Sequence, residues 1–542
     1  MTKRASSKWT RDRVLNTFGV ALLLLTFAVA MFRILARERR EADPDTVTIR
    51  FAHTHLEGTV REAFNYLARE YMERNPGVRV EQMAIPERIY DIWTQTQLVG
   101  GTAPDLLHLA GGIDREMLAR FFVPLTETVH DPNPYNEGTH LEGLPWRETF
   151  IDGLAAPPAF QARLQEIYGV PNSFFTFRVY YNKEIYAEHF GDRPLPETYA
   201  EFVALLGAVA DLPPGPDGRL LPMAGSRFNA PFLLDFLFRT QTQKLTQDLN
   251  ISRHLLPDFR EQILAFLRGD WSLRSPAVLS GLTLMAEVGR YMPAGFMQMA
   301  REDAMFYFAQ GRALLMVSGS WDAESIRLQT TFPVGVIDLP APLPDDPRFS
   351  EFTLGRPSEG TTFGAAAFGL VRLSRHQDVA VDFLRFLTSA ESNRELARRA
   401  SWIPALVDVE PPEDMVPFLP YTGGYVPGFD LDYGPETRRL IETQRHILFE
   451  PSGGGVERFV RRIEGGYADA VEHELQRILV SARRNAAELD VSSGAWFLLA
   501  ELADDAEAMT RYSAIQETQN AMEWLNYWTR QEVEWIRREA EE

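Results

Sequence analysis

Hydrophobic and polar residues alternate along the first part of the chain body with the periods of strands and helices. The runs VTIRF at Val47–Phe51, VRVEQMA at Val78–Ala84 and DLLHLA at Asp105–Ala110 predict three strands. Apolar residues at helical spacing predict helices at Thr59–Arg74 and Ile89–Val99. Strands separated by helices over so short a length pair in parallel through right-handed crossovers. The predicted fold class is therefore α/β.

A second group of elements follows in the middle of the chain. Tyr168–Val170 and Phe177–Tyr181 are expected to be strands, and Lys183–Phe190 is expected to be a helix. A run of very small residues within Thr361–Leu370 predicts another strand, and two helices follow within 377–399. This second set repeats the mixture of strands and helices of the first, which indicates a second α/β unit.

The stretch Asp303–Trp321 is the most informative part of the pattern. An amphipathic helix is expected to stop at Gly311, where glycine enters the left-handed conformation cheaply, and the apolar run Ala313–Val317 predicts a buried strand. Ser320 is a candidate cap for a helix that begins with Trp321. Ligands of open α/β sheets lie outside the carboxyl ends of strands, so we expect this indole at a ligand site. Packing in the core is the alternative.

From residue 488 the pattern becomes helical. Trp496–Met509 and Arg511–Ala540 read as amphipathic helices. We expect this extension to pack on the body of the protein; a partner-binding or self-associating helix is the alternative.

The N-terminus predicts export. Basic residues precede the apolar run Val14–Phe32, whose length is close to the roughly 20 residues that span a bilayer. Ala28-Val29-Ala30 within that run fits a signal-peptide cleavage site. The segment is either a cleaved signal or a membrane anchor, and both place the residues from 45 onward outside the cytoplasm.

Composition narrows the function. The net charge is −20, and basic residues gather at the N-terminus, so the acidic body argues against a nucleic-acid partner. The chain has no cysteine, which excludes disulfides, thiolate metal sites and cysteine nucleophiles. No G-x-S-x-G, phosphate-binding loop or G-x-G-x-x-G motif is present, and His473-Glu474 lacks the zinc-protease spacing. We therefore expect neither an enzyme nor a cofactor.

Four segments in order resemble the extracellular solute-binding proteins of ABC importers, the maltose-binding-protein-like family 1. They are YGVPNSFFTFRVYYNKEIYAEHFG (168–191), PETYAEFVAL (196–205), FAQGRALLMVSGSW (308–321) and AAAFGLVRLSRHQDVAVDFLRFLTSAESNRELARRASWIPA (365–405). The resemblance covers roughly residues 46–485. It implies two α/β lobes of the periplasmic-binding-protein type II fold, joined by hinge crossovers, with a ligand clamped between them.

The implied domains have the following bounds. Residues 1–44 form the signal or anchor and linker, 45–171 with 364–410 form lobe 1, 172–363 with 411–487 form lobe 2, and 488–542 form the helical extension. Loops at predicted strand ends supply polar and aromatic side chains suited to sugars, whose hydroxyls need paired donors and acceptors. For the loops after the first and third strands, helix capping is the alternative. The His-x-His pair alone is too weak a signal for a metal site.

Some ligand contacts are expected from these loops and others are implied by the resemblance. The full set is His53, His55, Glu57, Gly111, Gly112, Asp114, Asn172, Ser173, Phe174, Asn229, Trp321, Asp322, Gly360, Thr361 and Tyr425.

The resemblance implies a monomeric extracytoplasmic protein that binds a mono- or oligosaccharide and delivers it to ABC permease subunits. A membrane-tethered sugar sensor and a carbohydrate-active hydrolase are the alternatives. A hydrolase requires two opposed carboxylates, a geometry that the sequence does not reveal.

Overall fold

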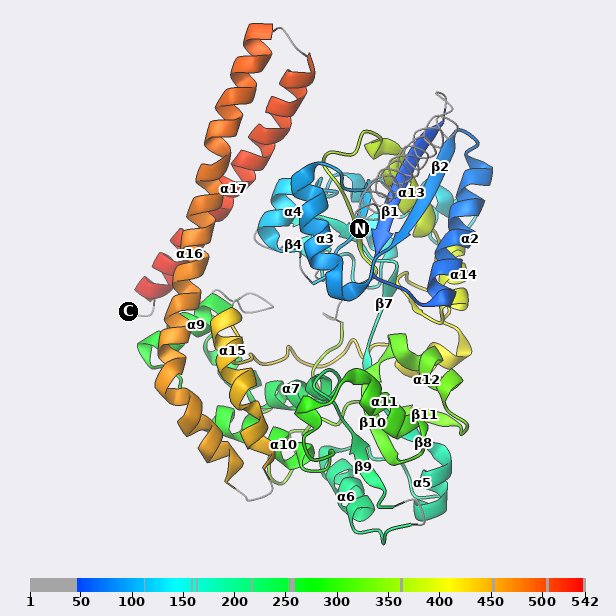
Figure 1. Cartoon of the computed structure of the whole chain (residues 1–542), viewed down its shortest axis with the longest axis vertical. Helices are drawn as coiled ribbons and strands as arrows, with labels where there is room; N and C mark the ends of the chain where they lie inside the picture. Colours follow the sequence, from blue (N-terminus) through cyan, green and yellow to red (C-terminus); the bar gives the residue numbers. More distant parts are fainter. Residues whose placement is uncertain are drawn as a thin grey trace, which may run out of the picture.

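The computed structural model describes residues 46–111, 113–156, 159–161, 164–215, 218–251, 253, 259–360, 364–450, 454–503 and 506–539. Two α/β lobes lie one above the other in Figure 1, and two long C-terminal helices run along one side of both. Among the described residues, none of the helices combines the length and hydrophobicity that a bilayer-spanning segment needs. The apolar segment predicted at Val14–Phe32 lies outside the described residues.

Lobe 1 is built on a five-stranded sheet with the order β2-β1-β3-β13-β6. Its strands are β1 (Val47–His53), β2 (Val78–Ala84), β3 (Leu106–His108), β6 (Gly169–Val170) and β13 (Phe368–Leu370). β1 pairs in parallel with both β2 and β3, as the sequence pattern predicts. β13 is antiparallel to both β3 and β6, so β6 runs in the same direction as β1. The carboxyl ends of β1, β3 and β6 therefore share one edge of the sheet.

Helices cover the lobe 1 sheet. They are α2 (Gly58–Arg74), α3 (Glu87–Gly100), α4 (Arg115–Phe121), α13 (Gln377–Leu387) and α14 (Ala390–Ala400). The ring of Phe51 on β1 packs against Phe64 of α2, Phe368 of β13 and Phe383 of α13, with ring centroids 5.6–5.7 Å apart. These rings belong to a fully buried apolar core, which holds the helices against the strands.

Lobe 2 is built on a four-stranded sheet with the order β11-β8-β10-β9. Its strands are β8 (Phe177–Asn182), β9 (Leu221–Ala224), β10 (Ala313–Gly319) and β11 (Val334–Ile337). Every residue of β10 is buried, in agreement with its continuous apolar sequence. β10 is antiparallel to β8 and parallel to β9, so the start of β8 and the ends of β9 and β10 share one edge.

Lobe 2 is richer in helices than lobe 1. They are α5 (Lys183–Phe190), α6 (Tyr199–Ala210), α7 (Ala230–Gln241), α8 (Gln243–Asp248), α9 (Phe259–Arg268), α10 (Pro276–Gly289), α11 (Arg301–Ala309), α12 (Ala323–Gln329) and α15 (Pro435–Gln444). α6 begins with a capping box: the Thr198 hydroxyl accepts from the Glu201 amide, and the Glu201 carboxylate accepts from the Thr198 amide.

A small sheet joins the lobes. The strand β7 (Ser173–Phe174) lies between β12 (Gly364–Ala365) and β14 (Ile403–Pro404), and both neighbours are antiparallel to it. Two residues separate β7 from β6 of lobe 1, and two more separate it from β8 of lobe 2. Three separate chain segments thus meet at this hinge, and Figure 1 shows β7 running between the two lobes.

Arg178 anchors the hinge on the lobe 2 side. Its side chain is 1% exposed, and its Nη1 and Nη2 donate to the two carboxylate oxygens of Glu359 at 2.6 and 3.1 Å. The same guanidinium donates to the carbonyl oxygens of Pro417 and Leu419 at 3.2 and 2.7 Å. A single buried cation therefore ties β8 to two other segments beside the hinge.

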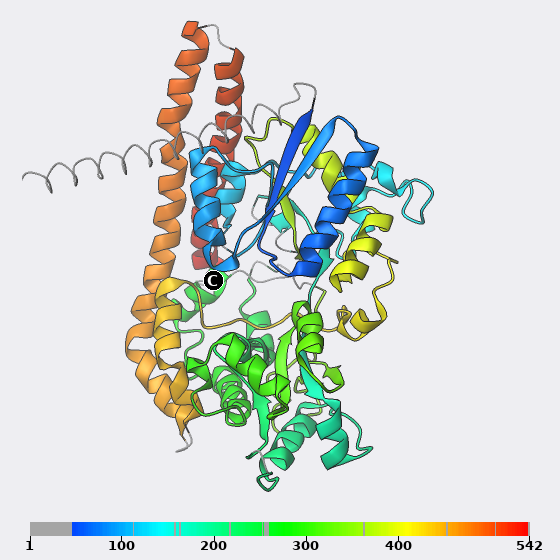
Figure 2. The same cartoon turned by 45° about the vertical axis from the view of Figure 1, so that its right-hand side comes forward.

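The two C-terminal helices, α16 (Gly455–Ala503) and α17 (Ala506–Glu539), form an antiparallel hairpin (Figure 2). The first part of α16 packs on α10, α15 and the 3-10 turn η7 (Arg445–Phe449) of lobe 2. α17 contacts α9 of lobe 2 and α4 of lobe 1. The predicted boundary at residue 488 falls inside α16, because this helix continues without a break from lobe 2 into the extension.

The Arg178 network predicts a large stability loss on mutation. Arg178→Met removes the guanidinium and leaves the Glu359 carboxylate without its buried partner, which costs about 3–5 kcal/mol of unfolding free energy. Urea unfolding measures the change. Arg239→Met is the matched control, because Arg239 pairs with Asp430 on the surface, with side chains 46% and 32% exposed, and should lose less than about 1 kcal/mol. Equal losses in the two variants would contradict the assignment.

Candidate functional site

Three histidines gather where β1 and β3 end in lobe 1. His53 is the last residue of β1, His55 follows it by two residues, and His108 is the last residue of β3. Ring centroids of His53 and His55 lie 5.8 Å apart, and those of His55 and His108 are stacked at 5.2 Å. The sequence singled out His53 and His55 but not His108. His108 could have been found from the sequence, because two parallel strands that each end in a histidine place both histidines at the same edge of the sheet.

Burial keeps the three imidazoles neutral. Burial lowers the pKa of His53 to about 3, with His55 and Arg61 adding to the effect. Burial also lowers the pKa of His55 to about 4 and that of His108 well below its ordinary value. A neutral imidazole offers one donor and one acceptor nitrogen, the same combination that a hydroxyl offers. At neutral pH the three imidazoles are therefore uncharged; His53 is fully buried, and His55 and His108 are half-buried.

His55 and Glu57 lie at the hinge side of lobe 1. The His55 ring is 4.9 Å from that of Trp402, which directly precedes the hinge strand β14. The side chain of Glu57 is 51% exposed, and its Oε2 lies 4.0 Å from His55 Nδ1. This carboxylate is accessible from solvent. Among the residues that the structure describes, no group of three or more His, Asp or Glu side chains is arranged to hold a metal ion.

Trp321 stands at the corresponding edge of lobe 2, in the 3-10 turn η5 (Ser320–Asp322) that follows β10. Its ring lies edge-on to Phe175, Phe177 and Phe232, with centroids 5.0, 5.5 and 5.9 Å away. Phe177 and Phe232 stack at 4.3 Å, and Phe228 meets Phe232 edge-on. All five rings are partly exposed. We call this group the aromatic cluster. Phe175 directly follows the hinge strand β7, and Phe177 is the first residue of β8.

Backbone contacts fix the turn that carries Trp321. The Ser320 amide donates to the carbonyl of Thr176 at 2.8 Å, and the Tyr180 hydroxyl donates to the carbonyl of Gly319 at 2.8 Å. A Cβ at Gly319 would lie 2.4 Å from the indole, so a glycine is required there. The predicted capping by Ser320 is wrong. Its hydroxyl instead accepts from the Thr176 amide at 3.3 Å, and α12 begins only at Ala323.

Asp322 and Asn229 are buried and engaged within lobe 2. The Asp322 carboxylate accepts from the Ser318 hydroxyl at 2.5 Å and pairs with Arg301, whose guanidinium also covers the Phe228 ring. Asn229 donates to the carbonyl of Val317 at 2.9 Å. Both side chains therefore hold the end of β10 in place, and their contact with a ligand stays a prediction.

Asn172, Ser173 and Phe174 lie inside the hinge. The side-chain Nδ2 of Asn172 donates to the carbonyl of Ala366 at 2.9 Å, and the Ser173 hydroxyl donates to the carbonyl of Ile403 at 2.8 Å. Phe174 is 6% exposed and belongs to the lobe 1 core. The structure thus gives these three residues a role in joining the chain segments. Their contact with a ligand likewise stays a prediction.

The remaining predicted residues are more scattered. Asp114 caps α4, because its carboxylate accepts from the Met117 amide at 2.8 Å, which is the alternative weighed from the sequence. Tyr425 is 48% exposed and accepts through its carbonyl from Ser358, two residues before Gly360. Gly111 is exposed in the loop after β3. Gly112 and Thr361 lie outside the described residues.

Solved structures of sugar-binding proteins share this fold. The apo form of RafE from Streptococcus pneumoniae matches with a TM-score of 0.54 at 15% identity, over 80% of this chain and 100% of that one. RafE in complex with raffinose matches with a TM-score of 0.52 at 16% identity, over 79% of this chain and 100% of that one. A cyclo/maltodextrin-binding protein complexed with maltotetraose matches with a TM-score of 0.52 at 15% identity, over 80% of this chain and 98% of that one. No curated protein matches the chain in sequence.

A family profile identifies the chain where the structures show only its fold. The profile of the bacterial extracellular solute-binding proteins matches residues 66–416, which is well over half of the chain and includes the hinge, the aromatic cluster and His108. The chain belongs to this family of binding proteins, whose members work outside the cytoplasm.

Proposed function

We propose that the protein binds a carbohydrate between its two lobes and delivers it to the permease of an ABC importer. The observation that carries this proposal is the aromatic cluster beside the hinge. It presents partly exposed rings on lobe 2, next to the same hinge that borders the neutral histidines and Glu57 of lobe 1.

The two edges suit the two kinds of surface on a sugar. A sugar ring has apolar C–H faces, which stack on aromatic rings, and burial of that surface contributes roughly 25 cal/mol per Å². Its hydroxyls pair with neutral imidazole nitrogens and with the Glu57 carboxylate, and such pairing selects between sugars more than it adds net affinity. The proteins of similar fold that hold raffinose and maltotetraose support this ligand class.

The hinge supplies the mechanism of capture. Three short strands join the lobes, and few residues need to change their backbone angles for the lobes to rotate. Rotation would bring the aromatic cluster and the histidine edge onto opposite faces of one solute. The permease then distinguishes the closed, loaded protein from the open, empty one.

The N-terminal segment fits this role. In our proposal Val14–Phe32 either is removed as a signal peptide or keeps the monomeric protein tethered to the outer side of the inner membrane. Either outcome places the lobes where an importer collects its solute.

A membrane-tethered sensor is the second candidate function. The observation that favours it is the hairpin, because α17 contacts α4 of lobe 1 and α9 of lobe 2 and so touches both bodies that closure would move. Growth on the bound sugar distinguishes the two functions: loss of the gene abolishes uptake for a transport protein and only the transcriptional response for a sensor.

Removal of the indole tests the sugar site. Trp321→Ala deletes the ring that contacts Phe175, Phe177 and Phe232, so affinity for the sugar found by a thermal-shift screen should fall at least about tenfold, or about 1.4 kcal/mol. Calorimetry measures the affinity. Trp524→Ala is the matched control, because Trp524 is 49% exposed on α17 and should leave affinity unchanged. Unchanged affinity in Trp321→Ala would sink the assignment.

The lowered histidine pKa values predict acid sensitivity. Unfolded histidine has a pKa of 6.5 and folded His55 one of about 4, so below pH 6.5 the unfolded chain binds the proton first. Stability is therefore full above pH 6.5 and falls on acidification, by up to about 1.4 kcal/mol per pH unit for each such histidine. His55→Gln should flatten the slope between pH 6.5 and 5 in urea unfolding. The exposed His130→Gln should not, and parallel curves for His55→Gln and the wild type would refute the prediction.

A further inference from the structure

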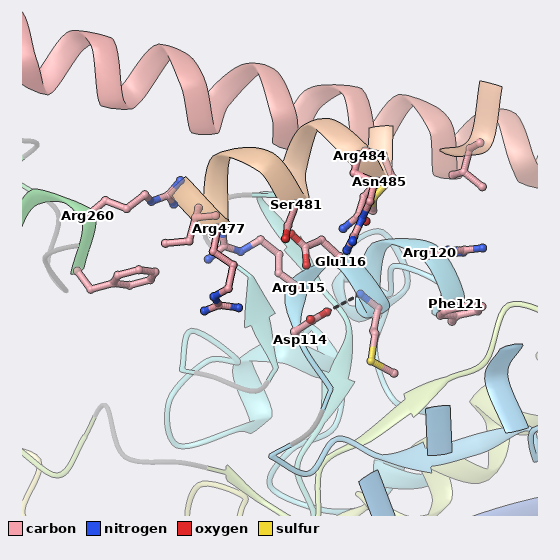
Figure 3. A pocket seen from close by; sticks show the side chains of 15 residues that line it. Asp114, Arg115, Glu116, Arg120, Phe121, Arg260, Arg477, Ser481, Arg484 and Asn485 are labelled. Carbon is pink, nitrogen blue, oxygen red and sulfur yellow. Dashed lines mark hydrogen bonds between the residues drawn. The ribbon is translucent and has the colours of Figure 1, made fainter. Parts of the chain in front are cut away.

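A cavity of about 490 Å³ lies between lobe 1, lobe 2 and the hairpin, and Figure 3 shows it from close by. α4 of lobe 1, the start of α9 of lobe 2, and one face of α16 line it, with Met522 contributed by α17. Its volume is within the range of small-molecule sites. Neither the histidine edge nor the aromatic cluster contributes a residue to it.

The cavity concentrates positive charge in an acidic protein. Five arginines line it, and Asp114 and Glu116 are the carboxylates among its lining residues. The arginines are Arg115, Arg120, Arg260, Arg477 and Arg484. Guanidinium groups stay charged at any physiological pH. Gathering them in one cavity of a chain with a net charge of −20 is costly unless a negative charge offsets it.

Two of these arginines pair with buried carboxylates that do not line the cavity. Arg477 donates through Nε to Glu474 at 2.9 Å, and Glu474 is fully buried. Arg260 is fully buried as well and lies 3.4 Å from Glu532, whose side chain is 8% exposed. A guanidinium has five N–H donors, so the pair with Glu474 leaves Arg477 with donors for a second acceptor. Such pairing fixes the direction of the cations, which pre-organises a binding site.

The five lining guanidinium groups outnumber the two lining carboxylates. Asp114 uses one oxygen to accept from the Met117 amide as the cap of α4. Burial raises the pKa of Glu116 and Asp114 adds to the rise, while Arg115 and Arg477 act in the opposite direction. From α16, Ser481, Arg484 and Asn485 point toward α4 (Figure 3). Arg484 is exposed, and the structure gives it no ion pair among the residues it describes.

We propose that this cavity binds a small oxyanion with two or more negative charges, such as a diphosphate or a tricarboxylate. The guanidinium groups would donate paired hydrogen bonds to its oxygens, and Ser481 and Asn485 would add neutral donors. Because the lining comes from α4, α9 and α16, the bound anion joins lobe 1, lobe 2 and the hairpin at one point.

Titration calorimetry with sodium pyrophosphate and, separately, with citrate tests the proposal on the full chain. Chloride keeps the ionic strength constant, so that general screening does not change between samples. We expect saturable binding of at least one of the two anions, and the stronger one tells whether phosphate or carboxylate is preferred. Absence of binding by both up to about 10 mM would overturn the proposal.

A pair of adjacent residues supplies matched variants. Arg484→Gln removes a lining cation and should weaken binding at least about tenfold. Arg483→Gln makes the same charge change on an exposed neighbour that does not line the cavity, and it should leave the affinity within about twofold. Equal weakening in both variants would show a general charge effect and overturn the site. Trp321→Ala should retain anion binding, which separates this site from the proposed sugar site.

Discussion

The two-lobed architecture depends on the pairing of one short strand. β7 holds only two residues, yet it bonds on one side to β12 and on the other to β14, segments that lie far away in the sequence. Buried side chains reinforce this pairing, since Asn393 donates to the carbonyl of Asn172 at 2.8 Å and accepts from the Ala405 amide at 3.0 Å. A buried backbone group without such a partner would destabilise the fold. The hinge is therefore narrow, and its short strands are paired on both sides through backbone and side-chain hydrogen bonds.

The same hinge determines which side chains become neighbours. Because β6 runs parallel to β1 and continues into β7, the ends of the lobe 1 strands are brought to the hinge. Because β8 starts just past β7 and β10 runs against it, Trp321 is brought there from the other lobe. The chemistry of the two edges differs: lobe 1 contributes buried neutral imidazoles, and lobe 2 contributes aromatic rings. Charged arginines gather elsewhere, between α4 and α16.

Sequence periodicity could predict much of this fold. The three lobe 1 strands, their parallel order and the buried strand that leads to Trp321 all follow from local patterns, because alternation and apolar runs report burial directly. The hinge partners of Ser173 could not be foreseen, since pairs of two residues carry no periodicity. The sequence also did not predict that the side chains of Asn229 and Asp322 form hydrogen bonds within lobe 2. Whether a polar side chain faces a ligand or a carbonyl depends on tertiary contacts that no local pattern encodes.

The unbroken length of α16 has a mechanical consequence. A helix of 49 residues follows a path of about 74 Å, and the first half of α16 curves along lobe 2, on which it packs (Figure 1). If the lobes rotate, we therefore expect the hairpin to move with lobe 2. Any swing of lobe 1 must then slide α4 across the hairpin. The contact there is small: Ala119 meets Ala486, Leu489, Met522 and Leu525, and Arg372 pairs with the largely exposed Glu517. This contact therefore combines small apolar side chains, one solvated ion pair and the arginine-lined cavity, and in the proposed lobe rotation it would limit how far the molecule opens.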